Sequence, residues 1–185
     1  MIDKHELREK VRRMKRMLTE AERLQASLAV FQRLENTAAF QLAEKILMYH
    51  SLPDEVSTIE FLKKWNGRKR FFLPRVNGVN LEILPYDVEK LVQGSFHILE
   101  PVGEELTDPS DIELIVTPAV AYDRRGNRIG RGKGFYDRLL KETKATKIGV
   151  VFHFQLSDED IASEPHDVPV DMVITDSCTI LVNRR

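Results

Sequence analysis

The sequence predicts an α/β fold, a three-layer α/β/α domain with a largely parallel, Rossmann-like central sheet. Short apolar runs typical of buried strands alternate along the chain with segments that carry apolar residues at helical spacing. This alternation favours parallel strands joined by helices that cover both faces of the sheet. The chain has 185 residues, a length that suits one domain, and no repeat or linker divides it. We therefore expect a single domain over residues 1–185.

The N-terminal part of the chain predicts two amphipathic helices. Apolar residues recur at helical spacing from about Lys4 to Leu18, which indicates the first helix. Thr19 and Glu22 form a capping-box pattern, so a second helix begins there. Lys4 and Arg8 share one face of the first helix. From spacing alone, such a pair is most often a solvated face.

The first core strand is expected at residues 46–49, followed by an exit loop at 51–55. Loops after strands are where ligands bind in open α/β sheets. Glu55 could accept a hydrogen bond from a substrate N–H there. On spacing alone, however, we expect Glu55 to begin the next helix, which runs over about 58–65, because an acid at that position favours the helix dipole.

A hairpin is expected next. Residues 70–73 are typical of a strand, which Pro74 ends, and an Asn-Gly turn signal separates it from an edge strand at 81–84. Residues 85–111 contain several prolines and predict a long loop with short elements, and such loops are often functional. His97 lies in this loop and is given no role.

The second half of the chain continues the alternation of strands and helices. Its expected elements are, in order, a strand at 112–116, a helix at 137–144, and strands at 147–152, 173–175 and 179–182.

The central feature is a glycine-rich, basic segment between a buried strand and a helix. Its four glycines are Gly126, Gly130, Gly132 and Gly134. Six bases and two acids lie between Asp123 and Arg138, a local charge of +4 in a chain of net charge -1. Free backbone N–H groups beside fixed positive charge suit a polyphosphate, and arginine can grip phosphate oxygens in a fork. The spacing matches neither a Walker A sequence nor a dinucleotide fingerprint. A flexible, merely solubilising loop is the less favoured alternative.

Two acids near this segment have open roles. Asp137 begins the following helix, where it could be an N-terminal cap or a magnesium ligand beside a triphosphate. Asp171 stands just before a strand, where acids are uncommon unless something uses them, and has a similar ambiguity.

Composition narrows the class of protein. A net charge of -1 gives nucleic-acid binding no support, and the single Cys178 excludes an intramolecular disulfide and a multi-cysteine zinc site. No apolar run approaches the ~20 residues of a membrane span, and the N-terminus shows no apolar signal region. We expect a cytoplasmic protein with no nucleic-acid or membrane partner and no obligate protein partner.

The segment from Gly126 to Asp137, Gly-Asn-Arg-Ile-Gly-Arg-Gly-Lys-Gly-Phe-Tyr-Asp, resembles the signature of the 5-formyltetrahydrofolate cyclo-ligase family, also called 5,10-methenyltetrahydrofolate synthetase. Weaker family features follow in the right order at Lys4 and Arg8, at residues 49–55, at residues 118–123 and at Asp171. The resemblance thus extends over nearly the whole chain. It implies cyclisation of 5-formyltetrahydrofolate to 5,10-methenyltetrahydrofolate, with ATP as co-substrate, Mg²⁺ as cofactor, and release of ADP and phosphate. The formyl oxygen would be phosphorylated, and folate N10 would then attack the formyl carbon.

The same resemblance implies roles for individual residues. Contacts to ATP are implied for Lys4, Arg8, Arg128, Ile129, Gly130, Arg131, Gly132, Lys133, Gly134, Phe135 and Tyr136. Contacts to the folate are implied for His50, Glu55, Phe96, Arg131, Gly132, Lys133, Gly134 and Phe135. Arg131 and Lys133 would lie nearest to the transferred phosphate and act in catalysis. Asp137 and Asp171 would serve Mg²⁺, directly or through water. The sequence departs from the family pattern at Ala119, where glycine is common, and at Phe135, where tyrosine is common.

Two other functions stay open from the sequence. One is a nucleotide- or folate-binding protein of the same fold that has lost or changed the reaction. The other is a nucleic-acid-binding module that uses the arginine-rich loop, which would bind with steep salt dependence. The overall acidity argues against the second.

Overall fold

The computed structural model describes residues 1–182. Its helices are α1 (Lys4–Met17), α2 (Glu20–Glu35), α3 (Ala38–Leu42), α4 (Ile59–Trp65) and α5 (Phe135–Lys141), with short 3₁₀ turns at Ser95–His97, Pro109–Asp111 and His153–Gln155. The strands of the main sheet are β1 (Lys45–Leu47), β2 (Arg70–Asn77), β3 (Asn80–Pro85), β6 (Leu114–Thr117), β9 (Thr146–Val150), β11 (Met172–Ile174) and β12 (Thr179–Leu181). The remaining strands are β4 (Leu91–Gln93), β5 (Leu99–Pro101), β7 (Ala121–Asp123), β8 (Arg128–Ile129) and β10 (Leu156–Ser157).

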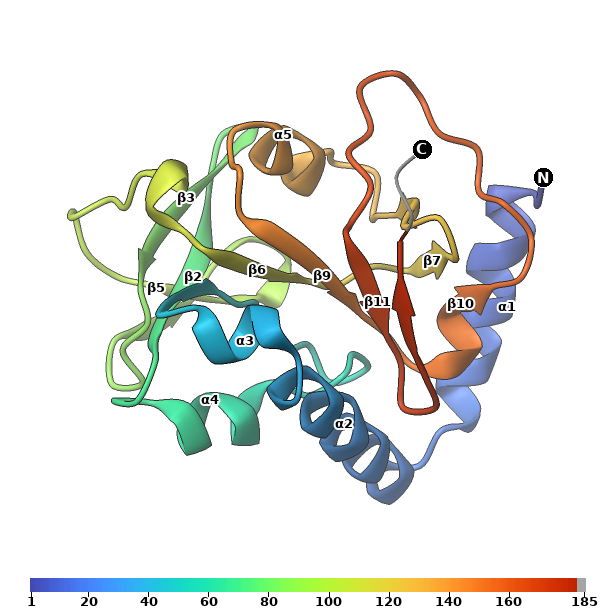
Figure 1. Ribbon diagram of the computed structural model, residues 1–185, viewed down its shortest axis with the longest axis horizontal. Coiled ribbons are helices and arrows are strands. Elements are labelled where there is room, and N and C mark those ends of the chain that lie inside the picture. Colours follow the sequence, from blue (N-terminus) through green and yellow to red (C-terminus); the bar gives the residue numbers. More distant parts are fainter. Residues whose placement is uncertain (183–185) are drawn as a thin grey trace.

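The main sheet crosses the molecule in the order β12-β11-β9-β6-β1-β2-β3 (Figure 1). The strands from β11 to β2 pair in parallel, whereas β12 and β3 are antiparallel edge strands. The expected α/β fold with a large, mostly parallel sheet is therefore confirmed.

Alternate residues of the central strands enter different cores because side chains of a strand point to opposite faces. Ile46 packs in a cluster with Phe31 of α2, whereas its neighbour Leu47 packs with Leu139 of α5. Accordingly, α2, α3 and α4 lie on one side of the sheet and α5 on the other (Figure 1). Within residues 1–182, this second face carries the seven-residue α5 rather than a full layer of helices.

α1 packs away from the main sheet, against the small sheet formed by β10, β7 and β8. Leu7 and Val11 are buried in a cluster with Ala121 and Ile129. The expected helix at 4–18 is confirmed at Lys4–Met17, and the Asp3 carboxylate caps it by accepting hydrogen bonds from the N–H groups of His5 and Glu6. This packing holds the first turns of α1 beside the glycine-rich segment, which contains β8.

The prediction that Pro74 ends a strand is wrong. β2 continues through Pro74, which pairs with Ile83 of β3. Two residues later, the Val76 N–H donates to the Glu100 carboxylate rather than to β3. Because alternate residues point their N–H positions to the same side, the Pro74 nitrogen faces away from β3, where the ladder requires no donor.

The segment from 85 to 111 is a long connection with short elements, as expected. β4 and β5 form a two-stranded antiparallel ribbon, joined by the turn that contains Phe96.

Within residues 1–182, no helix is both long and apolar enough to cross a bilayer.

Candidate active site

A cavity of about 430 Å³ lies beyond the carboxyl ends of β1 and β6. Walls come from α1, the loop after β1, the β4–β5 ribbon and the glycine-rich segment. Its lining includes the residues for which a nucleotide or folate contact is implied, namely Lys4, Arg8, His50, Glu55, Phe96, Arg128, Ile129, Gly130, Arg131, Gly132, Lys133, Gly134, Phe135 and Tyr136. Parallel strands bring these segments together because their carboxyl ends meet at one edge of the sheet. The structure thus assembles the predicted set, and the individual roles stay predictions.

Arg128 is a basic residue that lines this cavity and has a buried side chain. Only 8% of its side chain is exposed, and its Nη2 donates to the Pro118 carbonyl at 3.1 Å. Its Nη1 lies 3.8 Å from Asp137, and its guanidinium carbon lies 5.2 Å from the centre of the Tyr136 ring. Among residues 1–182, no hydrogen-bond partner faces the buried Arg128 Nε–H. A guanidinium with an unsatisfied donor beside a cavity is suited to receive an anion.

Asp123 fixes the turn in which the glycine-rich segment begins, a role that the sequence analysis missed. Its carboxylate is fully buried and accepts hydrogen bonds from the backbone N–H groups of Arg125, Asn127 and Ile161. An aspartate two residues before such N–H groups is the signature of an Asx turn, and it could have been found from the sequence.

The last part of the segment depends on glycine. Gly132 and Gly134 have φ values of 93° and 71°, in the left-handed region that residues with a side chain rarely adopt. Gly134 is the N-cap residue of α5 and leads into the helix without a side-chain cap. The capping alternative for Asp137 is therefore wrong, because Asp137 lies within the first turn and faces Arg128 instead.

Glu55 lies outside any helix, so the expectation that it begins one is wrong. α4 begins only after Thr58, whose hydroxyl donates to the Tyr49 carbonyl and accepts from the Ser51 N–H, which closes the loop on itself. Within this loop the Glu55 carboxylate accepts the Leu52 N–H at 2.8 Å. Burial raises the pKa of Glu55 above its ordinary value.

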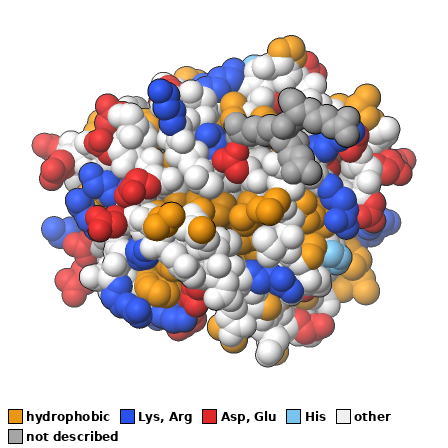
Figure 2. All heavy atoms as spheres, in the orientation of Figure 1, with side chains coloured by type: hydrophobic (Ala, Val, Ile, Leu, Met, Phe, Trp, Pro, Cys, Tyr) orange, Lys and Arg blue, Asp and Glu red, His pale blue; other side chains and the backbone are white. Residues whose placement is uncertain are grey.

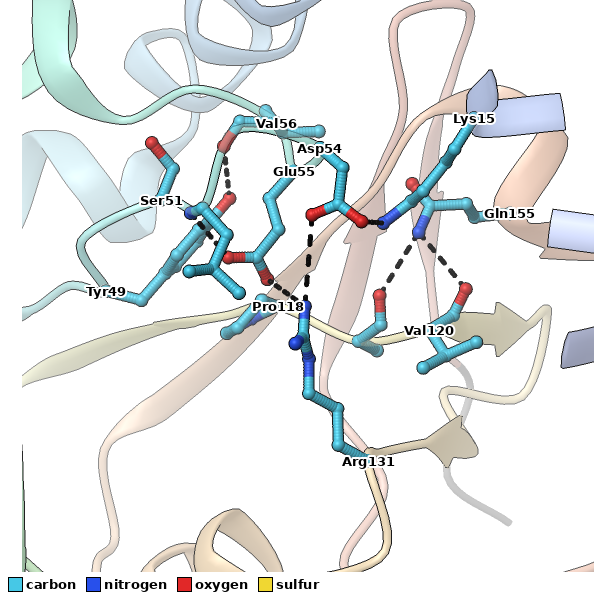
Figure 3. Close-up of polar contacts among 12 residues, drawn as sticks. Lys15, Tyr49, Ser51, Asp54, Glu55, Val56, Pro118, Val120, Arg131 and Gln155 are labelled. Atoms are coloured by element: carbon cyan, nitrogen blue, oxygen red, sulfur yellow. Dashed lines mark hydrogen bonds and ion pairs between the residues drawn. The ribbon is translucent and has the colours of Figure 1, made fainter. Parts of the chain in front are cut away.

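Arg131 connects the glycine-rich segment to this loop. Its Nη2 lies 3.9 Å from Glu55 Oε2 and 4.0 Å from Asp54 Oδ1 (Figure 3). Both distances exceed those of hydrogen bonds, so these two acids hold the guanidinium by charge attraction, and a ligand can redirect it.

The mouth of the cavity carries an aromatic pair and a lysine. The Phe96 ring lies 6.2 Å from the Phe135 ring and 5.6 Å from the Lys133 ammonium. Phe96 and its neighbour His97 both have positive φ values, 59° and 61°. Strain of this kind persists where surrounding structure enforces it, often at ligand-binding sites.

His50 lies half-buried in the cavity wall. Burial lowers the pKa of His50, so its imidazole is neutral at neutral pH and can both donate and accept a hydrogen bond.

The two acids expected to share a metal are not brought together. Asp137 lines the cavity, but Asp171 does not. Asp171 lies at the amino end of β11, where its carboxylate accepts the Lys147 N–H at 2.8 Å. The cavity lies beyond the carboxyl ends of the parallel strands, at the other edge of the sheet. Within residues 1–182, no cluster of three or more His, Cys, Asp or Glu side chains is arranged to hold a metal.

Comparisons with known proteins agree with this geometry. Residues 1–176 match the model of the 5-formyltetrahydrofolate cyclo-ligase family. The 5-formyltetrahydrofolate cyclo-ligase of Mus musculus is 31% identical in an alignment that covers 92% of each chain, and that of Haemophilus influenzae is 29% identical over 90% of this chain and 94% of its own. The solved structure of Aquifex aeolicus 5,10-methenyltetrahydrofolate synthetase superposes with a TM-score of 0.87 and 34% identity, over 98% of this chain and 93% of that one. The chain therefore belongs to the 5-formyltetrahydrofolate cyclo-ligase family, a family of ligases.

Proposed function

We propose that this chain uses ATP and Mg²⁺ to cyclise 5-formyltetrahydrofolate to 5,10-methenyltetrahydrofolate, with release of ADP and phosphate. The observation that carries the proposal is the polarity of the cavity. The buried Arg128 and the glycine-rich segment line one part of the cavity and suit phosphate groups, and the buried Glu55 lines another part. Arg131 of the glycine-rich segment lies 3.9 Å from Glu55, where the two parts meet.

The folate would be oriented by Glu55. A buried carboxylate that already accepts one backbone N–H keeps acceptor capacity for N–H donors of the pterin ring. Phe96 and Phe135 offer ring faces at the mouth of the cavity, against which an aromatic part of the folate can pack.

The triphosphate would bind along the other wall. Lys4 and Arg8 on α1, Arg128 and the left-handed backbone at Gly132 supply positive charge and free N–H groups to its oxygens. Lys133 and Arg131 would neutralise the charge on the phosphoryl group in transit, which is the main task of a phosphoryl-transfer site.

The reaction requires two displacements. The formyl oxygen attacks the γ-phosphorus and ADP leaves, which converts a poor leaving group into phosphate. Folate N10 then attacks the formyl carbon, loses its proton, and phosphate leaves. A site that holds both substrates in contact and excludes water favours both steps.

The residues fit a nucleotide-bound magnesium ion. Mg²⁺ in such enzymes takes most of its ligands from phosphates and water, so one or two carboxylates suffice, and Asp137 is the carboxylate at the phosphate wall. When bound, the ion would draw charge from the phosphates. Asp171 is not part of this assignment, because it lies away from the cavity.

The direct test follows the near-ultraviolet absorbance of the methenyl product, from 5-formyltetrahydrofolate with and without Mg-ATP. One ADP is expected for each product formed. Folded enzyme that gives no product at substrate levels up to about 1 mM would refute the proposal. Tight ATP or folate binding without turnover would instead support the binding-protein alternative.

Nucleic-acid binding has no support on the visible surface. On the face shown in Figure 2, Lys and Arg side chains are interspersed with Asp and Glu around an apolar band. We therefore expect no RNA or DNA binding with the steep salt dependence of a nucleic-acid site.

A further inference from the structure

Four charged side chains of alternating sign run from α1 to the cavity (Figure 3). Lys15 Nζ lies 3.7 Å from Asp54 Oδ2, and the other oxygen of Asp54 lies 4.0 Å from Arg131 Nη2. The same Arg131 nitrogen lies 3.9 Å from Glu55 Oε2. One guanidinium nitrogen is thus shared between two carboxylates.

The ends of this series are buried and its middle is not. The side chains of Lys15 and Glu55 are each 13% exposed, whereas those of Asp54 and Arg131 are 57% and 53% exposed. Burial lowers the pKa of Lys15, and the facing Asp54 carboxylate opposes this effect. A buried ammonium needs a counter-ion, so Lys15 keeps Asp54 in place.

Asp54 lies outside the cavity that would hold the substrates. It lines a neighbouring basic groove along α1, together with Lys15, while Arg131 lines both hollows. Asp54 therefore contacts the cavity lining through its ion pair with Arg131.

Without Asp54, nothing in this series would oppose the attraction of Arg131 for Glu55. Arg131 stands between Gly130 and Gly132, and a Cβ at Gly132 would meet no atom within 4 Å, so the backbone there has room to move. A guanidinium and a carboxylate that are free to approach form short, charge-assisted hydrogen bonds. Such a bond would occupy the Glu55 oxygen that the folate needs.

We propose that Asp54 is a positioning residue that holds the Arg131 guanidinium away from a hydrogen bond with Glu55, and that Lys15 in turn fixes Asp54. This rests on the proposed function for the use of Glu55 by the folate. The placement of Arg131 is a claim about the protein alone.

The structural test is a crystal structure of the Asp54→Asn variant without ligands. We expect Arg131 to move into hydrogen-bond distance of Glu55, about 2.9 Å. An Arg131 that keeps its distance from Glu55 would overturn the inference, whether or not the enzyme is active.

The functional test measures KM and kcat of the same variant for 5-formyltetrahydrofolate. We expect KM to rise about tenfold, because the folate must break a charge-assisted hydrogen bond, while kcat falls less than about threefold. In a Glu55→Gln background, Asp54→Asn should have almost no further effect on folate affinity measured by calorimetry, because no carboxylate remains to capture Arg131. Independent, additive effects of the two substitutions would contradict the inference.

Two matched variants separate positioning from a general loss of charge. Asp54→Glu keeps the carboxylate and should restore most of the affinity. Asp158→Asn removes an exposed acid that pairs at 3.4 Å with Arg124, a base of the same segment as Arg131. Neither Asp158 nor Arg124 lines the cavity, so this substitution should leave KM unchanged. If the unmodified enzyme forms no product, the proposed function fails, and the crystal structure alone decides the position of Arg131.

Discussion

Replacement of Lys133 by alanine should separate chemistry from folding. Lys133 is exposed at the tip of the glycine-rich segment, and its ammonium lies 5.6 Å from the centre of the Phe96 ring. Its backbone carbonyl accepts a hydrogen bond from Arg138, which an alanine would preserve. The substitution therefore removes one charge from the cavity mouth and little from the fold.

The substitution is expected to change stability only slightly and turnover strongly. An exposed contact between an ammonium and a ring contributes about 0.5–1 kcal/mol. For a chain of this size, that lowers the melting temperature by about 1–4 °C. If the ammonium neutralises the transferred phosphoryl group, its loss should lower kcat by about 10²–10³, the effect of removing one preorganised charge-stabilising donor.

The assay compares the initial rate of methenyl formation with the thermal unfolding of the same preparation. Lys144→Ala serves as the control, since Lys144 is an exposed lysine just beyond α5 and outside the cavity lining. Lys144→Ala should change neither the initial rate nor the melting temperature. A Lys133→Ala enzyme that keeps more than about a tenth of its turnover, against the 10²–10³ loss expected, would refute the role assigned to this residue.

Two further substitutions test other parts of the site, and a third tests the packing of the core. Asp137→Asn should raise the Mg²⁺ concentration needed for half-maximal rate. It should also lower the free energy of unfolding by about 1–3 kcal/mol, because Arg128 stays buried without its acid. If the free energy of unfolding in urea falls but the Mg²⁺ titration is unchanged, Asp137 has a structural role only. Glu55→Gln should abolish most turnover yet raise the melting temperature at pH 8. Since burial raises the pKa of Glu55 above 4.5, the stability associated with its protonated form is full below pH 4.5 and is lost as the pH rises through the folded-state pKa. The advantage of Glu55→Gln should therefore shrink as the pH falls toward 4.5, and a difference that is constant with pH would contradict the buried ionised carboxylate. Gly149→Ala should lower the free energy of unfolding by about 1–3 kcal/mol in urea, because its methyl group would overlap the ring of Tyr122; an unchanged urea midpoint would show that the ring is free to move.

The parts of the fold with strong local patterns were predictable. The capping box at Thr19 and Glu22 forms as expected, with both reciprocal hydrogen bonds. Buried strands such as 114–117 were found within two residues of their bounds, because apolar runs between turn signals report burial directly.

The errors have a common physical cause, which is that tertiary partners decide between locally equivalent states. Glu55 was expected to begin a helix, but the Leu52 N–H and Arg131 hold it in a closed loop. Pro74 was expected to end a strand, but its nitrogen faces the side of β2 where β3 needs no donor. The family resemblance assigns Asp137 and Asp171 to Mg²⁺, but the fold places Asp137 at the cavity and Asp171 at the amino end of β11, at the opposite edge of the sheet, so their roles at a metal stay predictions.

The charge balance of the cavity lining bears on how a metal could be bound without a cluster of three acids. Arg128 faces Asp137, and Arg131 faces Asp54 and Glu55, so these phosphate-wall arginines each face an acid before any ligand arrives. A triphosphate would compete with these acids for the guanidinium groups, since phosphate oxygens make stronger bidentate pairs. An acid released from Arg128 would need a new counter-charge, and the cation that accompanies the triphosphate can supply it. Asp137 would then neutralise an arginine in the free enzyme and a metal ion in the complex, so nucleotide and metal are expected to bind cooperatively rather than in sequence at separate sites.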